Sequence, residues 1–171
     1  MWRTPAGRGF IMLAVMSAAL GFAMNAHLNI QTNYFNDVLL LSGPQFGYIT
    51  AIREIGGFVI IFLTAMFYRF SLQSVTAGAI VVLAVGYGLF SIAGNFWTII
   101  PWVLITSFGM HTVLQTQIAL AMTLTTAPKS GAVLGKLGAF SQGGTLAALV
   151  MIYLIFKFEW LSYRPTFIIL G

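Results

Sequence analysis

The sequence predicts an all-α membrane protein, a polytopic bundle of five transmembrane helices followed by the start of a sixth. The first observation is compositional: of the 171 residues, 59% are hydrophobic and only 6% are charged. Soluble domains carry about 25% charged residues, so this chain lacks the surface that keeps a protein dissolved in water. The second is a mean hydropathy of +0.94. The third is that apolar segments of membrane-crossing length recur along the chain between short polar connections.

Each apolar segment matches the roughly 20 residues that a helix needs to cross the hydrocarbon core. The five predicted spans cover residues 10–34, 46–67, 75–92, 97–124 and 132–156. Because the connections between them are short, consecutive helices are predicted to be antiparallel neighbours. The last stretch, YRPTFIILG (163–171), is apolar but too short to span. We therefore expect residues 1–171 to be a single transmembrane domain that stops at the start of a sixth helix.

The basic residues predict how the bundle is oriented. With a cytoplasmic N-terminus, five basic residues lie at the inner ends of the spans and two, Lys157 and Arg164, at the outer ends. The inner set is Arg3, Arg8, Arg69, Lys129 and Lys136. This distribution follows the positive-inside rule. It predicts a multi-pass protein of the plasma (inner) membrane whose partner is the lipid bilayer.

Polar side chains gather at similar depth in four of the five spans. Ionisable and amide side chains within spans usually face a bundle interior or a water-filled cavity. The third span offers almost none beyond Tyr87 and is predicted to face lipid. The residues predicted to line a substrate cavity are Asn25, His27, Asn29, Arg53, Glu54, His111, Gln115 and Gln142.

Arg53 and Glu54 are adjacent inside the second span, where charges are costly. They differ by about 100° around the helix, so they are predicted to point in different directions. One interpretation is a structural clamp with Glu54 as the counter-ion of Arg53. The others are a direct role in substrate or proton binding, and snorkelling to the interface. The two histidines titrate near neutral pH, which suits a proton-coupled step. Hydrogen bonding between helices is the alternative for the histidines, and it is the favoured interpretation of each single Asn or Gln.

Small residues form a stripe along the fifth span. Gly131, Gly135, Ala139, Gly143 and Ala147 recur every four residues, a spacing that puts them on one helix face. Such a stripe lets another helix approach closely. It predicts a helix-packing surface, with a sliding surface during transport as the alternative.

The motifs of other function classes are missing from the sequence. There is no cysteine, no Gly-rich phosphate loop, no zinc-ligand spacing and no nucleophile elbow. The basic residues are scattered, so the formal charge of +5 does not indicate nucleic-acid binding. We expect no enzyme activity, no cofactor, no metal and no nucleic-acid partner.

Three segments resemble the amino-terminal half of a major facilitator superfamily transporter. SGPQFGYITAIREIGGFVIIFLTAMF (42–67) is similar to the second helix of that family, with its Ser-x-x-Gln-x-Gly start and an Arg-Glu further along. Residues 108–150 resemble its fourth helix, cytoplasmic loop and fifth helix, and residues 163–171 resemble the start of its sixth. The resemblance covers nearly the whole chain in order and spacing.

The sequence departs from the family pattern at several positions. In the loop between the second and third helices only Arg69 is retained, as a remnant of the cytoplasmic motif, and Tyr68 and Ser71 replace its Asp and second Gly. Ile105 occupies a position where the family often carries Arg, so no proton-coupling role transfers there. The fifth helix keeps the glycines of its motif without the proline.

The resemblance implies a fragment of a secondary active transporter that moves a small solute by alternating access. Its substrate is not specified, and its partner is the carboxy-terminal half of the same transporter. The alternative is a small non-transporting membrane protein, a scaffold or assembly subunit that associates through the small-residue stripe of the fifth span.

Overall fold

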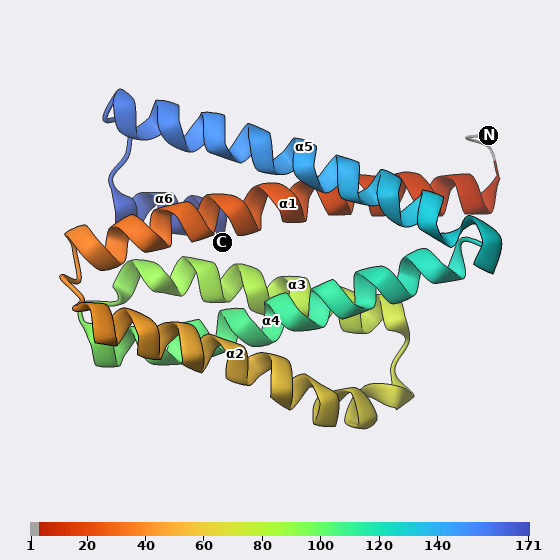
Figure 1. Cartoon of the computed structure of the whole chain (residues 1–171), viewed down its shortest axis with the longest axis horizontal. Helices are drawn as coiled ribbons and strands as arrows, with labels where there is room; N and C mark the ends of the chain where they lie inside the picture. The colour runs from red at the N-terminus through yellow and green to blue at the C-terminus, as the bar shows by residue number, and fades with distance from the viewer. Residues whose placement is uncertain (1–3) are drawn as a thin grey trace.

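The computed structural model describes residues 4–171, except for the side chains of residues 63–65, as a bundle of helices along one axis (Figure 1). The α-helices are α1 (Pro5–Asp37), α2 (Gly43–Met66), α3 (Leu72–Leu89), α4 (Phe96–Thr123), α5 (Ser130–Lys157) and α6 (Tyr163–Leu170). The 3₁₀ turns are η1 (Phe67–Arg69), η2 (Phe90–Ile92) and η3 (Ala127–Lys129). Five segments are long and apolar enough to cross a membrane, and they coincide with the five predicted spans.

Short polar side chains fix where several of these helices begin. The Thr4 hydroxyl accepts from the Gly7 amide at the start of α1. The Ser71 hydroxyl does the same for α3, accepting from Ser74. At the start of α4, Asn95 and Thr98 cap each other reciprocally. These caps satisfy amide groups that the first helical turn leaves without a partner, so each helix starts where its loop ends.

Consecutive helices run in opposite directions, as predicted, but α3 and α4 are the only consecutive pair among the main packing partners of the described residues. α1 packs on α5, whereas α2 and α3 both pack on α4 (Figure 1). α1 and α2 therefore belong to different layers of the bundle. Their polar faces meet across a cavity, which is described in the next section.

The α1–α5 crossing is built on two glycines. A Cβ atom on Gly21 would collide with the Ser141 carbonyl oxygen, and one on Gly144 would collide with the Ala18 carbonyl oxygen. Backbones this close leave no room for a side chain at either position. Leu137 and Ala148 are buried on the same face of α5. The contact face thus includes Leu137, Gly144 and Ala148.

The predicted small-residue stripe lies on a different face of α5. Its five residues, Gly131, Gly135, Ala139, Gly143 and Ala147, are all exposed. A Cβ added at Gly131, Gly135 or Gly143 would meet no other atom within 4 Å. Within the described residues the stripe packs against no helix, because the contact face is set one position away by Gly144 and Ala148.

Aromatic side chains fill one end of the bundle, where α6 returns against α1 and α3. Phe90 and Phe167 are fully buried there, and their ring centroids lie 5.6 Å apart. Tyr34 packs edge-on against Phe167 and donates its hydroxyl to the Ala93 carbonyl at 2.5 Å. α6 is thus a short helix held against α1 and α3 by buried aromatic side chains.

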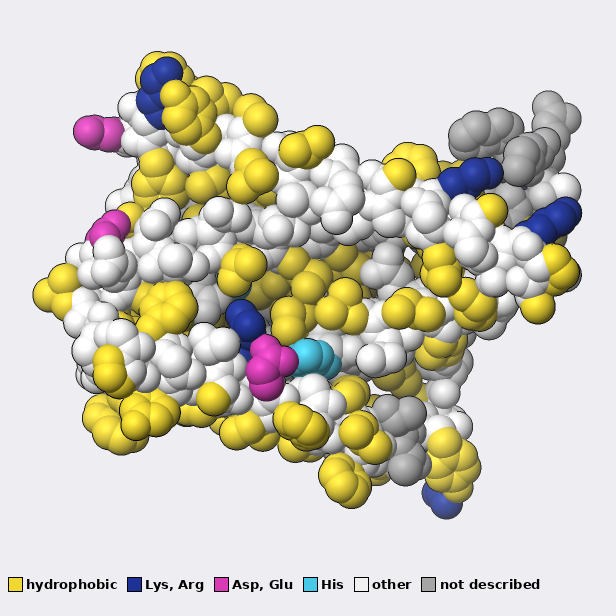
Figure 2. Space-filling model, in the orientation of Figure 1, with side chains coloured by type: hydrophobic (Ala, Val, Ile, Leu, Met, Phe, Trp, Pro, Cys, Tyr) yellow, Lys and Arg dark blue, Asp and Glu magenta, His cyan; other side chains and the backbone are white. Residues whose placement is uncertain are grey.

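Apart from Arg53 and Glu54 near the middle of α2, the charged side chains of the described residues lie toward the two ends of the bundle (Figure 2). Arg8, Arg69, Lys129 and Lys136 belong to the helix ends on the N-terminal side of α1. The residues at the opposite end are Asp37, Lys157, Glu159 and Arg164. Arg3, which the prediction also assigned to the basic end, lies outside the described residues. Because consecutive helices run in opposite directions, these four basic residues come together at one end of the bundle.

Candidate functional site

A polar cavity of about 410 Å³ lies between α1, α2, α3 and α4. Figure 2 shows a basic, an acidic and a histidine side chain together at the edge of a hollow on this side of the molecule. Three apolar residues, Met24, Leu28 and Met110, complete the wall. The polar lining residues are Asn25, His27, Gln31, Arg53, Glu54, Tyr87, Thr106, Ser107 and His111. Polar groups at this depth in four apolar helices mark the cavity as the candidate site.

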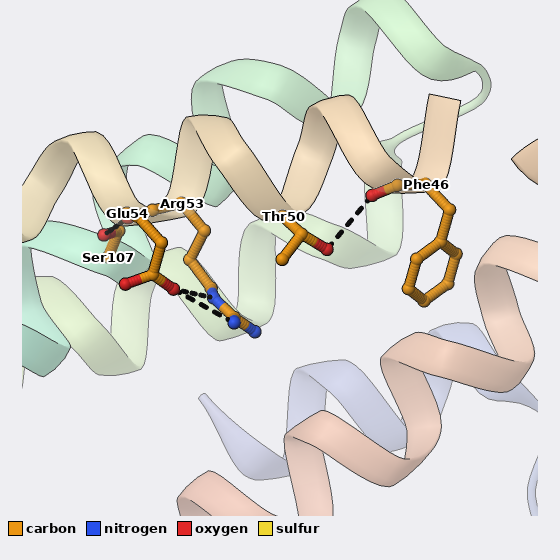
Figure 3. Close-up of polar contacts among 5 residues, drawn as sticks. All are labelled: Phe46, Thr50, Arg53, Glu54 and Ser107. Atoms are coloured by element: carbon orange, nitrogen blue, oxygen red, sulfur yellow. Dashed lines mark hydrogen bonds and ion pairs between the residues drawn. The ribbon is translucent and has the colours of Figure 1, made fainter. Parts of the chain in front are cut away.

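Arg53 and Glu54 form an ion pair on the cavity side of α2 (Figure 3). Glu54 Oε1 accepts from Arg53 Nε at 3.2 Å and from Nη2 at 3.1 Å. The prediction that the two side chains point in different directions is wrong. Although their Cα positions differ in direction around the helix, both side chains are long enough to bend toward each other. Both therefore line the same cavity.

Ser107 and Gly56 hold α2 close to α4 behind this pair. The Ser107 hydroxyl donates to the Arg53 carbonyl oxygen (Figure 3). A Cβ on Gly56 would collide with the Ser107 side chain. The hydroxyl thus anchors the backbone of Arg53 directly, which fixes where the guanidinium leaves α2. Arg53 is 33% exposed and Glu54 52% exposed along their side chains, so the pair is reached from the cavity.

His27 is buried deeply behind the cavity wall. It is 4% exposed, and its imidazole stacks on Tyr87 with ring centroids 3.8 Å apart and planes 15° apart. Phe90 packs edge-on against the same imidazole, at 4.5 Å. The ring nitrogens of His27 make no hydrogen bond of ordinary geometry among the described residues, and the nearest polar side chain that interacts with them is Gln31, one turn along α1. Buried polar atoms in native proteins nearly always have partners, so two such nitrogens on one side chain are unusual.

His111 lies on the α4 side of the cavity, against Gly57 of α2. A Cβ on Gly57 would approach within 3.1 Å of His111 Cε1, so glycine is what admits the imidazole between the two helices. Its Nε2 is also buried and has no hydrogen-bond partner in the described part of the chain. The wall of the cavity therefore holds buried imidazole nitrogens of His27 and His111 near one ion pair.

Asn25 connects the cavity to the α1–α5 contact. Its Nδ2 donates to the Thr145 hydroxyl and to the Gly21 carbonyl, both at 2.9 Å. Asn29 lies one turn further along α1 and donates to the Asn25 carbonyl at 2.8 Å. The amide of Asn25 is thus a link between helices, and Asn29 extends the same face without lining the cavity.

Five of the eight predicted cavity residues line this cavity: Asn25, His27, Arg53, Glu54 and His111. The other three do not. Gln115 lines a separate groove between α2, η1, α3 and α4, and Gln142 is exposed on α5. Asn29 hydrogen-bonds along α1, as described above.

The prediction missed several lining residues. Tyr87 lines the cavity although α3 was expected to face lipid, and Ser107, Thr106 and Gln31 join it. The spacing of Ser107 four residues before His111, on one helix face, is a signal that the sequence already contained. No group of three or more His, Cys, Asp or Glu side chains is placed to hold a metal ion in the described residues.

Comparison of the chain with protein-family models finds no match, and comparison with curated proteins also finds none. The site is therefore interpreted from its own geometry.

Proposed function

We propose that this chain forms the amino-terminal helical half of a secondary active transporter, which moves a small solute by alternating access. The observation that carries the proposal is the cavity itself. It places an ion pair and two incompletely bonded histidines among helices that are otherwise apolar enough to span a membrane. Charges at this depth are retained where they bind a substrate or an ion.

The fold is compatible with this role. In transporters built from two helical halves, the substrate site lies near the bilayer midplane at their interface. Arg53 lies near the middle of α2, and His111 lies near the middle of α4. The resemblance to the major facilitator superfamily in the sequence supports the same proposal and assigns the remaining cavity wall to a second half. The basic end of the bundle would then be cytoplasmic, in the plasma (inner) membrane.

Cysteine accessibility tests alternating access directly, because the chain contains no cysteine of its own. Leu28→Cys places a thiol in the cavity wall at an exposed apolar residue. Val81→Cys is the matched control, since Val81 is an equally apolar, exposed residue of α3 outside the cavity lining. The chain is reconstituted in vesicles together with the second half that the proposal requires, and it is treated with a charged, membrane-impermeant thiol reagent on one side at a time.

Alternating access predicts that Leu28→Cys reacts with the reagent from both sides and that Val81→Cys reacts from neither. Reaction from one side only, or from neither side, contradicts the proposal. The control separates water in the cavity from general exposure of apolar surface, because both positions are exposed in the bundle but only one faces the cavity.

One observation favours the second candidate, a non-transporting scaffold or assembly subunit. The stripe of small residues on α5 is exposed and available to another helix. A scaffold would use this stripe for stable association and would leave the cavity closed to water. The labelling experiment distinguishes the two functions, since only the transporter requires access to Leu28 from both sides.

A further inference from the structure

The Arg53–Glu54 ion pair of the cavity leaves one polar atom of each side chain without a hydrogen bond to a described residue. Both hydrogen bonds of the pair go to Glu54 Oε1, from Arg53 Nε and Nη2. Arg53 Nη1 and Glu54 Oε2 make no hydrogen bond to another described residue, and Figure 3 shows the unbonded nitrogen and the unbonded oxygen at opposite ends of the pair. The pair thus keeps one free donor on its positive group and one free acceptor on its negative group.

The two histidines of the same cavity offer further hydrogen-bonding groups. Nε2 of His111 is buried without a partner in the described residues, and the ring nitrogens of His27, which is 4% exposed, have only the Gln31 side chain near them. A neutral imidazole offers one donor and one acceptor. Because native proteins rarely leave buried polar atoms unpaired, these atoms indicate that a bound ligand completes their hydrogen bonds.

The charge of the cavity limits what that ligand is. Among the described residues that line it, Arg53 and Glu54 are the only Lys, Arg, Asp or Glu side chains, so their formal charges cancel. A ligand with a net charge would leave that charge uncompensated at membrane depth, which is unfavourable. A ligand that carries one charge of each sign pairs with both free atoms and keeps the site neutral.

We propose that the cavity binds a small zwitterion of the amino-acid class, with its carboxylate on Arg53 and its ammonium group on Glu54. This inference rests on the proposed function, since it names the solute of the same site. Charge-assisted hydrogen bonds to both groups are stronger than those a neutral polyol makes. The cavity of about 410 Å³ has room for an amino acid, and Met24 and Met110 supply apolar wall for its hydrocarbon part.

The test uses the purified full chain and measures equilibrium binding by ligand-induced shifts in thermal unfolding. The probes are neutral amino acids of increasing size, such as alanine and leucine. Each is compared with its decarboxylated amine, its deaminated carboxylate and a neutral polyol. We expect saturable binding of at least one amino acid, with affinity weaker by about tenfold or more for both analogues, because each lacks one charge-assisted contact.

Two variants reverse the preference in opposite directions. Arg53→Gln leaves Glu54 alone, so the decarboxylated amine is expected to bind better than the amino acid. Glu54→Gln leaves Arg53 alone, so the deaminated carboxylate is expected to bind better. The matched controls are Arg69→Gln and Glu159→Gln, which make the same charge changes at exposed positions outside the cavity and keep the wild-type preference. A misfolded protein gives no such reversal.

The wild-type panel decides the inference even where a variant fails to fold. Tighter binding of an analogue with a net charge, tighter binding of the polyol, or no binding of any amino acid overturns it. If the inference falls while Leu28→Cys is still labelled from both sides, the solute site stands and only its substrate class is wrong. If neither binding nor labelling occurs, the proposed function falls as well.

Discussion

The imidazole of His27 on α1 stacks face to face on the phenol ring of Tyr87 on α3, with 3.8 Å between the ring centroids. This stack joins the two layers of the bundle directly behind the cavity. It combines a favourable ring contact with an unfavourable feature, since both imidazole nitrogens are buried and make no hydrogen bond of ordinary geometry among the described residues. The ring of His27 therefore favours packing, whereas its buried nitrogens favour binding of a polar ligand.

His27→Phe and His27→Ala separate these two demands. Phenylalanine keeps a ring against Tyr87 and removes two unpaired polar atoms, each of which costs about 1–3 kcal/mol when buried. We expect His27→Phe to unfold at the wild-type temperature or above it and to lose affinity for the cavity ligand. Alanine removes the ring and lowers stability by about 3 kcal/mol, on the scale of other buried aromatic deletions. Thermal unfolding in detergent measures both, and a strongly destabilised His27→Phe would contradict the argument.

Gly144 lies in the α1–α5 contact, whereas its neighbour Gly143 lies on an exposed face of α5. Gly144→Ala drives a methyl group into the Ala18 carbonyl, and we expect it to destabilise the bundle by about 1–3 kcal/mol, as overpacking does elsewhere. Gly143→Ala meets no atom within 4 Å and is expected to stay within about 0.5 kcal/mol of wild type. Chemical denaturation of the two variants in the same detergent gives the comparison. Equal losses would place the contact face elsewhere on α5.

The five spans were predictable because length and hydropathy alone determine them, and the structure changes each boundary by only a few residues. The packing face of α5 was not. Gly143 and Gly144 are both small, and periodicity cannot say which of two interleaved glycine rows meets α1. That choice depends on Gly21 of α1, where the other backbone makes its closest approach. The packing face of α5 therefore depends on both helices, and it cannot be predicted from the sequence of either helix alone.

The cavity was predictable in part for a similar reason. Charged and histidine residues within spans are rare enough to be noticed singly, and Arg53, Glu54 and His111 all line it. Amides are common and serve equally well as links between helices, which is what Asn25 and Asn29 do. The prediction missed that the side chains of Arg53 and Glu54 point into the same cavity, because the position of a residue around the helix determines only the direction of its Cα–Cβ bond. The long side chains then bend to satisfy their charges.

Tyr34 ties α1 to the turn between α3 and α4. Its buried hydroxyl donates to the Ala93 carbonyl at 2.5 Å. Tyr34→Phe keeps the ring contacts with Phe167 but leaves that carbonyl without this donor, so we expect a loss of about 1–3 kcal/mol. The control is Tyr48→Phe on α2, which removes a hydroxyl from an exposed residue and is expected to change stability by less than about 0.5 kcal/mol. Similar values for the two variants would show that the Ala93 contact contributes nothing.

Tyr163, at the start of α6, donates its hydroxyl to Asp37 Oδ2 at 2.5 Å. Burial, that hydrogen bond and the negative charge of Asp37 together raise the pKa of Tyr163 to about 12. A raised pKa means that the folded state favours the protonated phenol. The stabilisation is therefore fully present below the ordinary tyrosine pKa of about 10, and it is lost as the pH rises from there through about 12.

This contact predicts a pH-dependent weakening of the α1–α6 contact at alkaline pH. Tyr163→Phe removes both the hydrogen bond and the titrating group, so the difference in stability between wild type and variant should shrink to nothing as the pH rises through about 12. Ultraviolet difference spectra between the two proteins follow the phenolate of Tyr163 alone among the six tyrosines. Asp37→Asn tests the cause, because removing the negative charge should bring the pKa of Tyr163 back toward 10. If Tyr163 titrates near pH 10 in the wild-type protein, Asp37 does not raise its pKa.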